Sequence, residues 1–227
     1  GARLQFANDG TLFVSLGEGF KYMKDSQDPS NTHGKIVRIH ADGSIPADNP
    51  FTDGDGGKPS VYSYGHRNVQ GLYYDPETDT LYETEHGPKG GDELNRVTPD
   101  TNYGWPEITY GVNYDGTIIT SKTEAEGMAQ PMTYWVPSIA PSGLVMLTSD
   151  VYPGWKGDLF TGGMNGPAGL ELTRIDLENG EVAGRESLFD GEYPIRDVVQ
   201  GPDGHLYVAT KDFDGIFRVD IVEAGTD

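Results

Sequence analysis

The stretch from residue 72 to residue 87, LYYDPETDTLYETEHG, predicts a β-hairpin. Apolar and aromatic residues alternate with polar ones on both sides of a Thr-Asp turn, and side chains in a strand alternate between two faces. The Asp, Pro and Thr residues between the two alternating runs are typical of a turn. The stretch therefore indicates two half-buried antiparallel strands.

Three further stretches repeat this pattern. They are LQFANDGTLFVSLGE from Leu4, LVMLTSDVYPGWKGDLFTGG from Leu144 and VVQGPDGHLYVAT from Val198. Each of the four hairpins is followed by another short strand with an arginine near its middle, and these arginines are Arg38, Arg96, Arg174 and Arg218. A repeated unit of strand, turn, strand and strand is the sequence signature of a β-propeller blade.

We therefore predict an all-β chain of about four propeller blades that forms a single domain over residues 1–227. The leucines that anchor the repeats stand at positions 12, 81, 159 and 206, so their spacings are 69, 78 and 47. The shortest spacing matches a bare blade of about 40–50 residues, and the longer ones leave room for loops that carry a site. A two-sheet sandwich is the alternative, because it also has short, regularly spaced strands.

The composition excludes several classes of function. The sequence has 16 Lys and Arg residues against 36 Asp and Glu residues, a net charge of −20, and it contains no cysteine. Such a negative field disfavours nucleic acid and anionic membranes as partners, and disulfides and thiolate metal sites are excluded. No run approaches the ~18 apolar residues of a membrane-spanning helix, so we expect no membrane insertion.

Seven segments resemble, in the family's order, the soluble PQQ-dependent aldose sugar dehydrogenases of the glucose/sorbosone dehydrogenase family. They are GARLQFANDGTLFVSLGE, GHRNVQGL, EHGPKGGDELN, NYGWP, GVNYDG, VPSIAPSGL and IRDVVQGPDGHLYVAT. The ordered set spans nearly the whole chain. The resemblance implies a six-bladed propeller of which this chain holds about the later four blades, so that the first two blades are expected upstream of Gly1.

The resemblance also implies that the cofactor PQQ, a planar quinone with three carboxylates, binds beside the segment GHRNVQGL. Arg67 would polarise the quinone carbonyl that receives the hydride, and a guanidinium offers a rigid fork to such an oxygen. Asn68 and Gln70 would hydrogen-bond the cofactor. The further cofactor contacts that the resemblance assigns are His86, Ser138 and Arg196. From the residues alone, Arg67 could instead form an ion pair with one of the many carboxylates.

Calcium is expected at two places. The Gly-Pro-x-Gly-Gly loop of residues 87–91 cannot sustain a sheet ladder, so its carbonyl oxygens are predicted to be free for a hard cation. By the resemblance, the carbonyls of Gly87 and Pro88 bind the calcium that anchors PQQ. Glu93 and the carbonyl of Tyr103 would hold a second, structural calcium. Without the resemblance, an ordinary acidic loop explains the same residues.

The activity implied by the resemblance is oxidation of an aldose at C1 to the lactone. A hydride passes to the quinone while a histidine base takes the hydroxyl proton. Glu18 matches the acidic residue that orients this base, and the base itself would fall just before Gly1, so we expect a fragment that lacks it. The implied partners are an aldose and an artificial or quinone electron acceptor, and the implied location is periplasmic or secreted. The oligomeric state is left open.

Two positions depart from the family pattern. Asn165 or a close neighbour stands where the family usually carries a lysine, and Pro194 stands where many members have an arginine. Losing two cations beside a tricarboxylate weakens its binding by about 1–3 kcal/mol each. These departures favour an alternative, a non-catalytic calcium-binding propeller that binds a sugar or a protein. A propeller hydrolase of the lactonase kind is a third interpretation, but it leaves GHRNVQGL unexplained.

Overall fold

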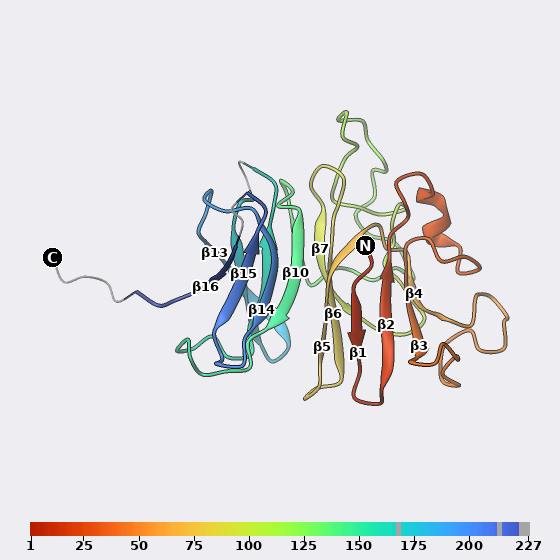
Figure 1. The fold of residues 1–227 in the computed structure, drawn as a ribbon. Coiled ribbons are helices and arrows are strands. Elements are labelled where there is room, and N and C mark those ends of the chain that lie inside the picture. The colour runs from red at the N-terminus through yellow and green to blue at the C-terminus, as the bar shows by residue number, and fades with distance from the viewer. Residues whose placement is uncertain (167–168, 213–214, 223–227) are drawn as a thin grey trace. The chain divides into compact units, whose positions relative to one another are not determined.

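The computed structural model describes residues 1–166, 169–212 and 215–222. Within these ranges the chain consists of short strands and one short 3-10 helix, η1 (Met23–Gln27) (Figure 1). The predicted all-β class is therefore confirmed. Over the same ranges, no helix has the length and the apolar character needed to cross a membrane.

The strands of the described residues join into four sheets (Figure 1). The first sheet has the order β1 (Leu4–Phe6), β2 (Thr11–Leu16), β3 (Lys35–His40), β4 (Val61–Tyr64) and β8 (Thr101–Asn102). The second has the order β5 (Val69–Asp75), β6 (Thr80–Glu85), β7 (Asp92–Val97) and β9 (Thr133–Trp135). The third has the order β10 (Pro141–Met146), β11 (Leu159–Gly163), β12 (Leu172–Glu178) and β13 (Glu181–Leu188). The fourth has the order β14 (Ile195–Gln200), β15 (Leu206–Thr210) and β16 (Ile216–Arg218).

The four predicted hairpins are all present. They are the pairs β1/β2, β5/β6, β10/β11 and β14/β15, and in each repeat the predicted third strand follows as β3, β7, β12 or β16. Four sheets of mostly consecutive strands are typical of propeller blades, whereas a sandwich has two sheets. The parallel strand β8, which pairs with β4, was not predicted from the sequence. The number of blades in a closed ring stays a prediction.

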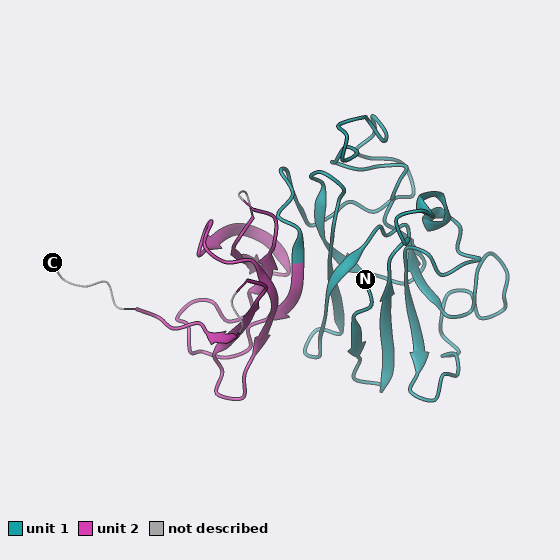
Figure 2. Cartoon of the chain, turned by 45° about the horizontal axis from the view of Figure 1, so that its top comes forward, with its two compact units in different colours: residues 1–141 teal, residues 142–227 magenta. Residues whose placement is uncertain are grey.

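The chain divides into two compact units, residues 1–141 and residues 142–227 (Figure 2). In the first unit, Phe13 and Ile36 of the first sheet pack against Leu72 and Leu81 of the second. In the second unit, a core formed by β11, β12, β14 and β15 includes Phe160, Leu172, Ile195, Val198 and Leu206. Burial of these apolar side chains holds each pair of sheets together. The prediction of a single domain stays a prediction.

In two of the repeats, the recurring arginine of the third strand forms an ion pair with an aspartate of the same repeat. Arg38 of β3 places Nη2 2.7 Å from Oδ2 of Asp9, which lies in the turn between β1 and β2. Arg174 of β12 places Nε 2.6 Å from Oδ2 of Asp158, the residue directly before β11. In these two repeats the arginine therefore ties the third strand to the hairpin that precedes it.

A buried lysine fixes the segment between β2 and β3, residues 17–34. Lys35 is fully buried at the start of β3. Its Nζ donates hydrogen bonds to the carbonyl oxygens of Asp25 (2.8 Å), Ser26 (3.0 Å) and His33 (2.5 Å). Since an ammonium group has three N–H donors, these three carbonyls satisfy it completely. The segment is thereby attached to the first sheet.

Replacement of this lysine tests that attachment. Lys35→Met should lower the free energy of unfolding by about 2–3 kcal/mol at neutral pH, because the three carbonyl oxygens lose their donor. Burial lowers the pKa of Lys35 from 10.5 to about 8, so the folded protein releases this proton before the unfolded chain does. Stability of the wild type should therefore rise as the pH increases from about 8 to 10.5.

The variant should lack this rise. Urea unfolding of both proteins at about pH 7 and about pH 9.5 measures the difference, which should be larger at the higher pH. A difference between the two proteins that is the same at both pH values would contradict the assignment.

Candidate functional site

Most of the predicted site residues of the first unit lie at one edge of its sheets. Glu18 follows β2, Arg67 precedes β5 and His86 follows β6. The antiparallel register brings these ends together, because Val69 of β5 pairs with Glu85 of β6. Residues that are far apart in the sequence therefore meet at this edge.

The guanidinium of Arg67 is buried and bonds to a loop of backbone carbonyls. Arg67 is 6% exposed. Its Nη1 donates to the carbonyl oxygens of His86 (2.7 Å) and Gly87 (3.1 Å). Its Nη2 donates to the hydroxyl of Tyr114 at 3.3 Å. Within the part of the chain that the structure describes, the guanidinium thus bonds to carbonyl and phenol oxygens, and not to the carboxylate that an ion pair requires.

Two aromatic rings flank this guanidinium. Its carbon Cζ lies 5.4 Å from the ring centroid of Trp105 and 5.9 Å from that of Tyr114. A cation at these distances is attracted by the ring quadrupole. Neither residue was predicted to lie at the site. The segments NYGWP and GVNYDG that contain them were noted only as family motifs, since nothing local indicates contact with Arg67.

The backbone of the segment GHRNVQGL is held by the carboxylate of Glu85. Its Oε2 accepts hydrogen bonds from the backbone N–H of Arg67 (2.5 Å) and of Asn68 (3.1 Å). The side chains of Asn68 and Gln70 contact each other, because Gln70 Nε2 donates to Asn68 Oδ1 at 3.0 Å. The predicted residues Arg67, Asn68 and Gln70 therefore lie together, and Glu85, which was not predicted, fixes two of them.

The loop of residues 87–91 is held by a second buried carboxylate, that of Asp92. Oδ1 of Asp92 accepts a hydrogen bond from the N–H of Gly87 at 2.9 Å. Oδ2 accepts from the N–H of Ile139 (2.8 Å) and of Ala140 (2.9 Å). Ser138 lies at the same place, where its Oγ accepts from the N–H of Ala140 at 3.1 Å. A cofactor contact of Ser138 stays a prediction.

The expectation that the carbonyl oxygens of this loop are free is wrong for Gly87. That carbonyl accepts the N–H of Arg67 at 3.1 Å. A carbonyl oxygen has two lone pairs, so a second partner such as a cation can still bind it. The ring of His86 also contacts the backbone, with Nε2 lying 2.7 Å from the carbonyl oxygen of Pro141. The loop is therefore ordered by the first unit's own hydrogen bonds.

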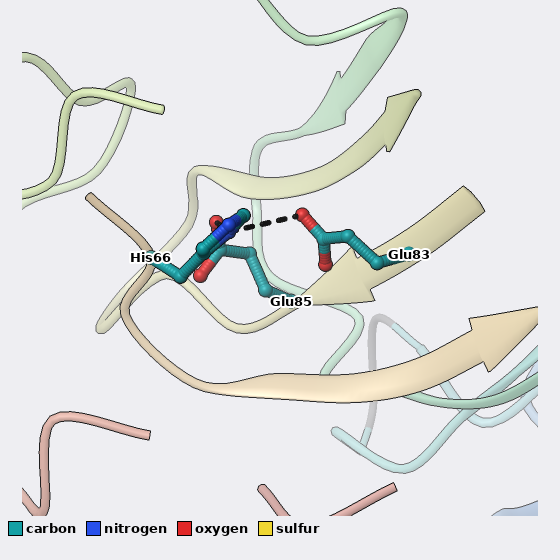
Figure 3. Close-up of side chains that lie close together, drawn as sticks. All are labelled: His66, Glu83 and Glu85. Atoms are coloured by element: carbon teal, nitrogen blue, oxygen red, sulfur yellow. Dashed lines mark ion pairs between the residues drawn. The ribbon is translucent and has the colours of Figure 1, made fainter. Parts of the chain in front are cut away.

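Buried acidic side chains surround His66, the residue directly before Arg67 in the chain, and Figure 3 shows Glu83 and Glu85 beside its ring. His66 is fully buried, with Nδ1 3.6 Å from Oε1 of Glu83 and 3.6 Å from Oε1 of Glu85. Its Nε2 lies 2.9 Å from the hydroxyl of Ser63. Burial alone would lower the pKa of His66, but the two carboxylates raise it to about 9. The imidazolium form therefore compensates part of the negative charge of this cluster.

Glu93 belongs to the same cluster. Asn95 Nδ2 bridges Glu83 Oε1 (2.7 Å) and Glu93 Oε2 (3.2 Å). Burial, followed by the charge of Glu85, raises the pKa of Glu93 well above its ordinary value. The raised pKa of Glu93 thus reflects first the burial of its carboxylate and then the nearby negative charge of Glu85.

The cluster fits the expected structural calcium. A cavity of about 10 Å³ is lined by Glu85, Glu93 and Tyr103 among others, which is about the room that a single water or ion occupies. Among the described residues, Glu83 Oε2 and Asn95 Oδ1 have no hydrogen-bond partner. Calcium binds carboxylate, amide and backbone oxygens. Glu93 and Tyr103 both line this cavity, and the binding of calcium by Glu93 and the carbonyl of Tyr103 stays a prediction.

Arg67 also lines a second, larger pocket. It has a volume of about 210 Å³ and is lined by Glu18, Gly19, Phe20, Arg67 and Asn68. Within the described part of the chain, Glu18 Oε2 and Arg67 Nε are buried without a hydrogen-bond partner. Burial raises the pKa of Glu18, and the charge of Arg67 opposes this shift. Buried polar atoms normally find partners, so the pocket offers polar groups to a ligand, and the binding of the expected cofactor there stays a prediction.

The remaining predicted residue, Arg196, belongs to the second unit. It lies exposed in β14, with Nη1 3.8 Å from Sδ of Met164. Asn165 and Pro194, the two departures from the family pattern, lie in the same unit. The predicted contact of Arg196 with a cofactor carboxylate stays a prediction.

Comparisons with known proteins match this chain to one family. The sequence profile described as Glucose / Sorbosone dehydrogenase matches residues 1–219. The chain is 40% identical over 219 residues to the aldose sugar dehydrogenase YliI of Escherichia coli (strain K12), and the match covers 95% of this chain and 58% of that protein.

Solved structures agree with this match. A crystal structure of a glucose dehydrogenase superposes with a TM-score of 0.91 at 40% identity, covering 97% of this chain and 64% of that chain. The PQQ-bound form of an aldose sugar dehydrogenase from Streptomyces coelicolor superposes with a TM-score of 0.71 at 33% identity, covering 92% of this chain and 55% of that chain. The chain thus spans less than two thirds of each of these relatives.

Removal of the carboxylate of Asp92 tests how the loop of residues 87–91 is held. Asp92→Ala should lower the free energy of unfolding by about 3 kcal/mol or more, because three backbone N–H groups lose their acceptor. Asp115→Ala is a matched control, since the Asp115 carboxylate also accepts a backbone N–H, that of Thr117, but is exposed. Urea unfolding should show little change for the control. Equal effects of the two substitutions would show that Asp92 does not support the loop.

Proposed function

Because the chain belongs to the glucose/sorbosone dehydrogenase family, we propose that it forms the cofactor-binding part of a PQQ- and calcium-dependent aldose dehydrogenase. The proposed reaction is oxidation of an aldose at C1 to the lactone. The observation that carries the proposal is the buried guanidinium of Arg67, which lies between a loop of carbonyl oxygens and a polar pocket. A relative that is PQQ-bound supports this cofactor.

Arg67 would act on the cofactor as a fixed cation. PQQ, when bound, supplies a quinone that accepts a hydride from the sugar C1. We propose that Arg67 donates an N–H to the quinone carbonyl, because Arg67 lines the pocket and its buried Nε has no hydrogen-bond partner among the described residues. A preorganised donor that faces developing negative charge stabilises the transition state. The hydrogen bonds to His86 and Gly87 hold the guanidinium in place for this role.

Asn68, Gln70, His86 and Ser138 are proposed to complete the cofactor site of the first unit. Asn68 also lines the pocket, and because its Oδ1 accepts a hydrogen bond from Gln70, we propose that its amide N–H groups meet the bound ligand. Arg196 of the second unit is proposed to meet a cofactor carboxylate. Six blades in the closed ring are likewise part of the proposal.

Glu18 is proposed to position the base of the reaction. Its Oε2 is buried and has no hydrogen-bond partner in the described residues, so it can accept the N–H of an imidazole. A carboxylate in this role fixes the orientation of a histidine and stabilises its protonated form after proton transfer. The histidine itself is expected just before Gly1.

Two calcium ions are part of the proposal. The carbonyls of Gly87 and Pro88 would hold the ion that anchors the cofactor. Glu93 and the carbonyl of Tyr103 would hold the second ion, which compensates the charge of the buried acidic cluster. The unpartnered oxygens of that cluster support this second site.

The remaining parts of the proposal follow from the family. They are an aldose as substrate, an artificial or quinone electron acceptor, and a periplasmic or secreted location. The competing function is that of a non-catalytic calcium-binding propeller. Measuring whether the protein changes the absorbance of added PQQ, as described below, separates the two functions.

Substitution of Arg67 by lysine tests the central role. In the full-length gene product supplied with PQQ and Ca²⁺, Arg67→Lys should reduce aldose-dependent dye reduction by about 100-fold or more, because lysine keeps the charge but loses the planar fork. Arg38→Lys is the matched control, since the Arg38 side chain is also largely buried but belongs to β3 of the first sheet and does not line this pocket. The control should keep its activity.

Two outcomes count against the proposal. Turnover that is unchanged in Arg67→Lys would remove Arg67 from the reaction. Failure of the wild-type protein to change the absorbance of added PQQ would instead favour the non-catalytic function.

The second calcium site has its own test. Saturating Ca²⁺, at about 100 times its Kd, should stabilise the wild-type protein by about 2–3 kcal/mol for each site filled. Glu93→Gln should lose the contribution of the second site, whereas Glu107→Gln, an exposed control in the same unit, should keep it. Thermal unfolding across a calcium titration measures both. A calcium response of Glu93→Gln that equals that of the wild type would refute the site.

A further inference from the structure

We propose that Phe20 determines substrate specificity at the pocket beside Arg67, and that its ring favours aldoses that carry a second sugar ring. The inference rests on the proposed function, because it assumes that the reacting end of an aldose enters this pocket. It concerns a residue that lies outside the motifs of the sequence and outside the proposed catalytic groups.

Phe20 lies at the rim of the pocket, whereas the polar groups lie at its floor. All three of Phe20, Glu18 and Arg67 line the same cavity of about 210 Å³. Phe20 is 73% exposed, while Glu18 is 4% and Arg67 is 6% exposed. A substrate whose reacting carbon reaches the buried polar groups therefore presents its more distant part to Phe20.

The ring of Phe20 is held in place by its neighbour. It stacks on Tyr114 with the two centroids 5.9 Å apart and the planes 24° from parallel. Tyr114 is in turn bonded to the guanidinium of Arg67 at 3.3 Å. The aromatic pair is thus connected through Tyr114 to the same side chain that forms the floor of the pocket.

The backbone of Phe20 adopts a left-handed conformation, which is unfavourable for a phenylalanine. Its φ is +66°, in the left-handed region that a phenylalanine enters at a cost of about 1–2 kcal/mol. Strained residues of this kind concentrate at ligand sites, where the surrounding structure imposes them. Here the conformation presents a large apolar ring to solvent at the mouth of a polar pocket.

The chemistry of this rim suits the apolar face of a sugar ring. Binding pockets combine aromatic walls with a few polar groups that orient the ligand, and this pocket has Glu18, Arg67 and Asn68 as its polar groups. An aromatic ring buries much apolar area at a small entropic cost, because it has only two side-chain torsions. A monosaccharide whose C1 lies at the floor of the pocket gains little binding energy from the aromatic ring of Phe20 at the rim. A disaccharide bound in the same way places its second sugar ring against Phe20.

The test compares two substrates in the full-length gene product with PQQ and Ca²⁺. Phe20→Ala should lower kcat/KM for maltose about 10-fold, through KM, and should change kcat/KM for glucose less than about 2-fold. Phe20→Asn is a second variant, because asparagine tolerates the left-handed conformation and keeps the fold if alanine does not. Ile118→Ala is the control, since Ile118 is similarly exposed at 72% in the same unit but does not line the pocket.

A direct binding measurement separates this inference from the proposed function. Titration calorimetry of maltose on the cofactor-free protein should show about 10-fold weaker binding for Phe20→Ala than for Ile118→Ala. If no aldose is oxidised but this difference is found, the proposed function fails, while the binding of a second sugar ring by Phe20 is supported. If oxidation proceeds and the ratio of the two substrates is the same in Phe20→Ala and the wild type, the role of Phe20 is refuted.

Discussion

The buried carboxylate of Glu85 is the interaction on which the candidate site depends. It accepts the N–H groups of Arg67 and Asn68 at the point where β5 begins, so the chain can place an arginine there without leaving backbone donors unpaired. Asp92 does the same for three N–H groups around the loop of residues 87–91. Two carboxylates thus fix the backbone, and the guanidinium of Arg67 is left to face the loop carbonyls and the pocket.

The buried carboxylate of Glu85 also adds negative charge to a cluster of acidic side chains beside the site. Glu83, Glu85 and Glu93 lie close together around His66 in a chain whose net charge is −20. The raised pKa of His66 and of Glu93 shows how the fold responds, by protonating the imidazole and disfavouring a further negative charge. A divalent cation is the other response that physical chemistry allows, and it links the proposed calcium to the placement of Arg67.

Much of this arrangement could be predicted from the sequence, because its signals are local. Period-two alternation around short turns predicted all four hairpins, and the segment GHRNVQGL predicted the group formed by Arg67, Asn68 and Gln70. The contacts of Tyr114 and Trp105 with Arg67 were missed because they join residues about forty positions apart, through loops without periodicity. The hydrogen bond from Arg67 to the Gly87 carbonyl could not be predicted from the sequence. The loop of residues 87–91 forms no strand pairing, but its carbonyl oxygens can still accept hydrogen bonds from side chains that are distant in the sequence. The parallel pairing of β8 with β4 likewise has no local signal.

The ion pairs inside the repeats affect how a protein of this kind can gain further repeats by gene duplication. Arg38 and Asp9 belong to one repeat, and Arg174 and Asp158 belong to another. In both cases the arginine and the aspartate belong to the same repeat. A duplicated gene segment that encodes one repeat would therefore carry both partners of the ion pair, and the new repeat would not need a charged residue from its neighbour. Evolution can therefore lengthen the array by whole modules, and selection can then refine the loops of each copy separately.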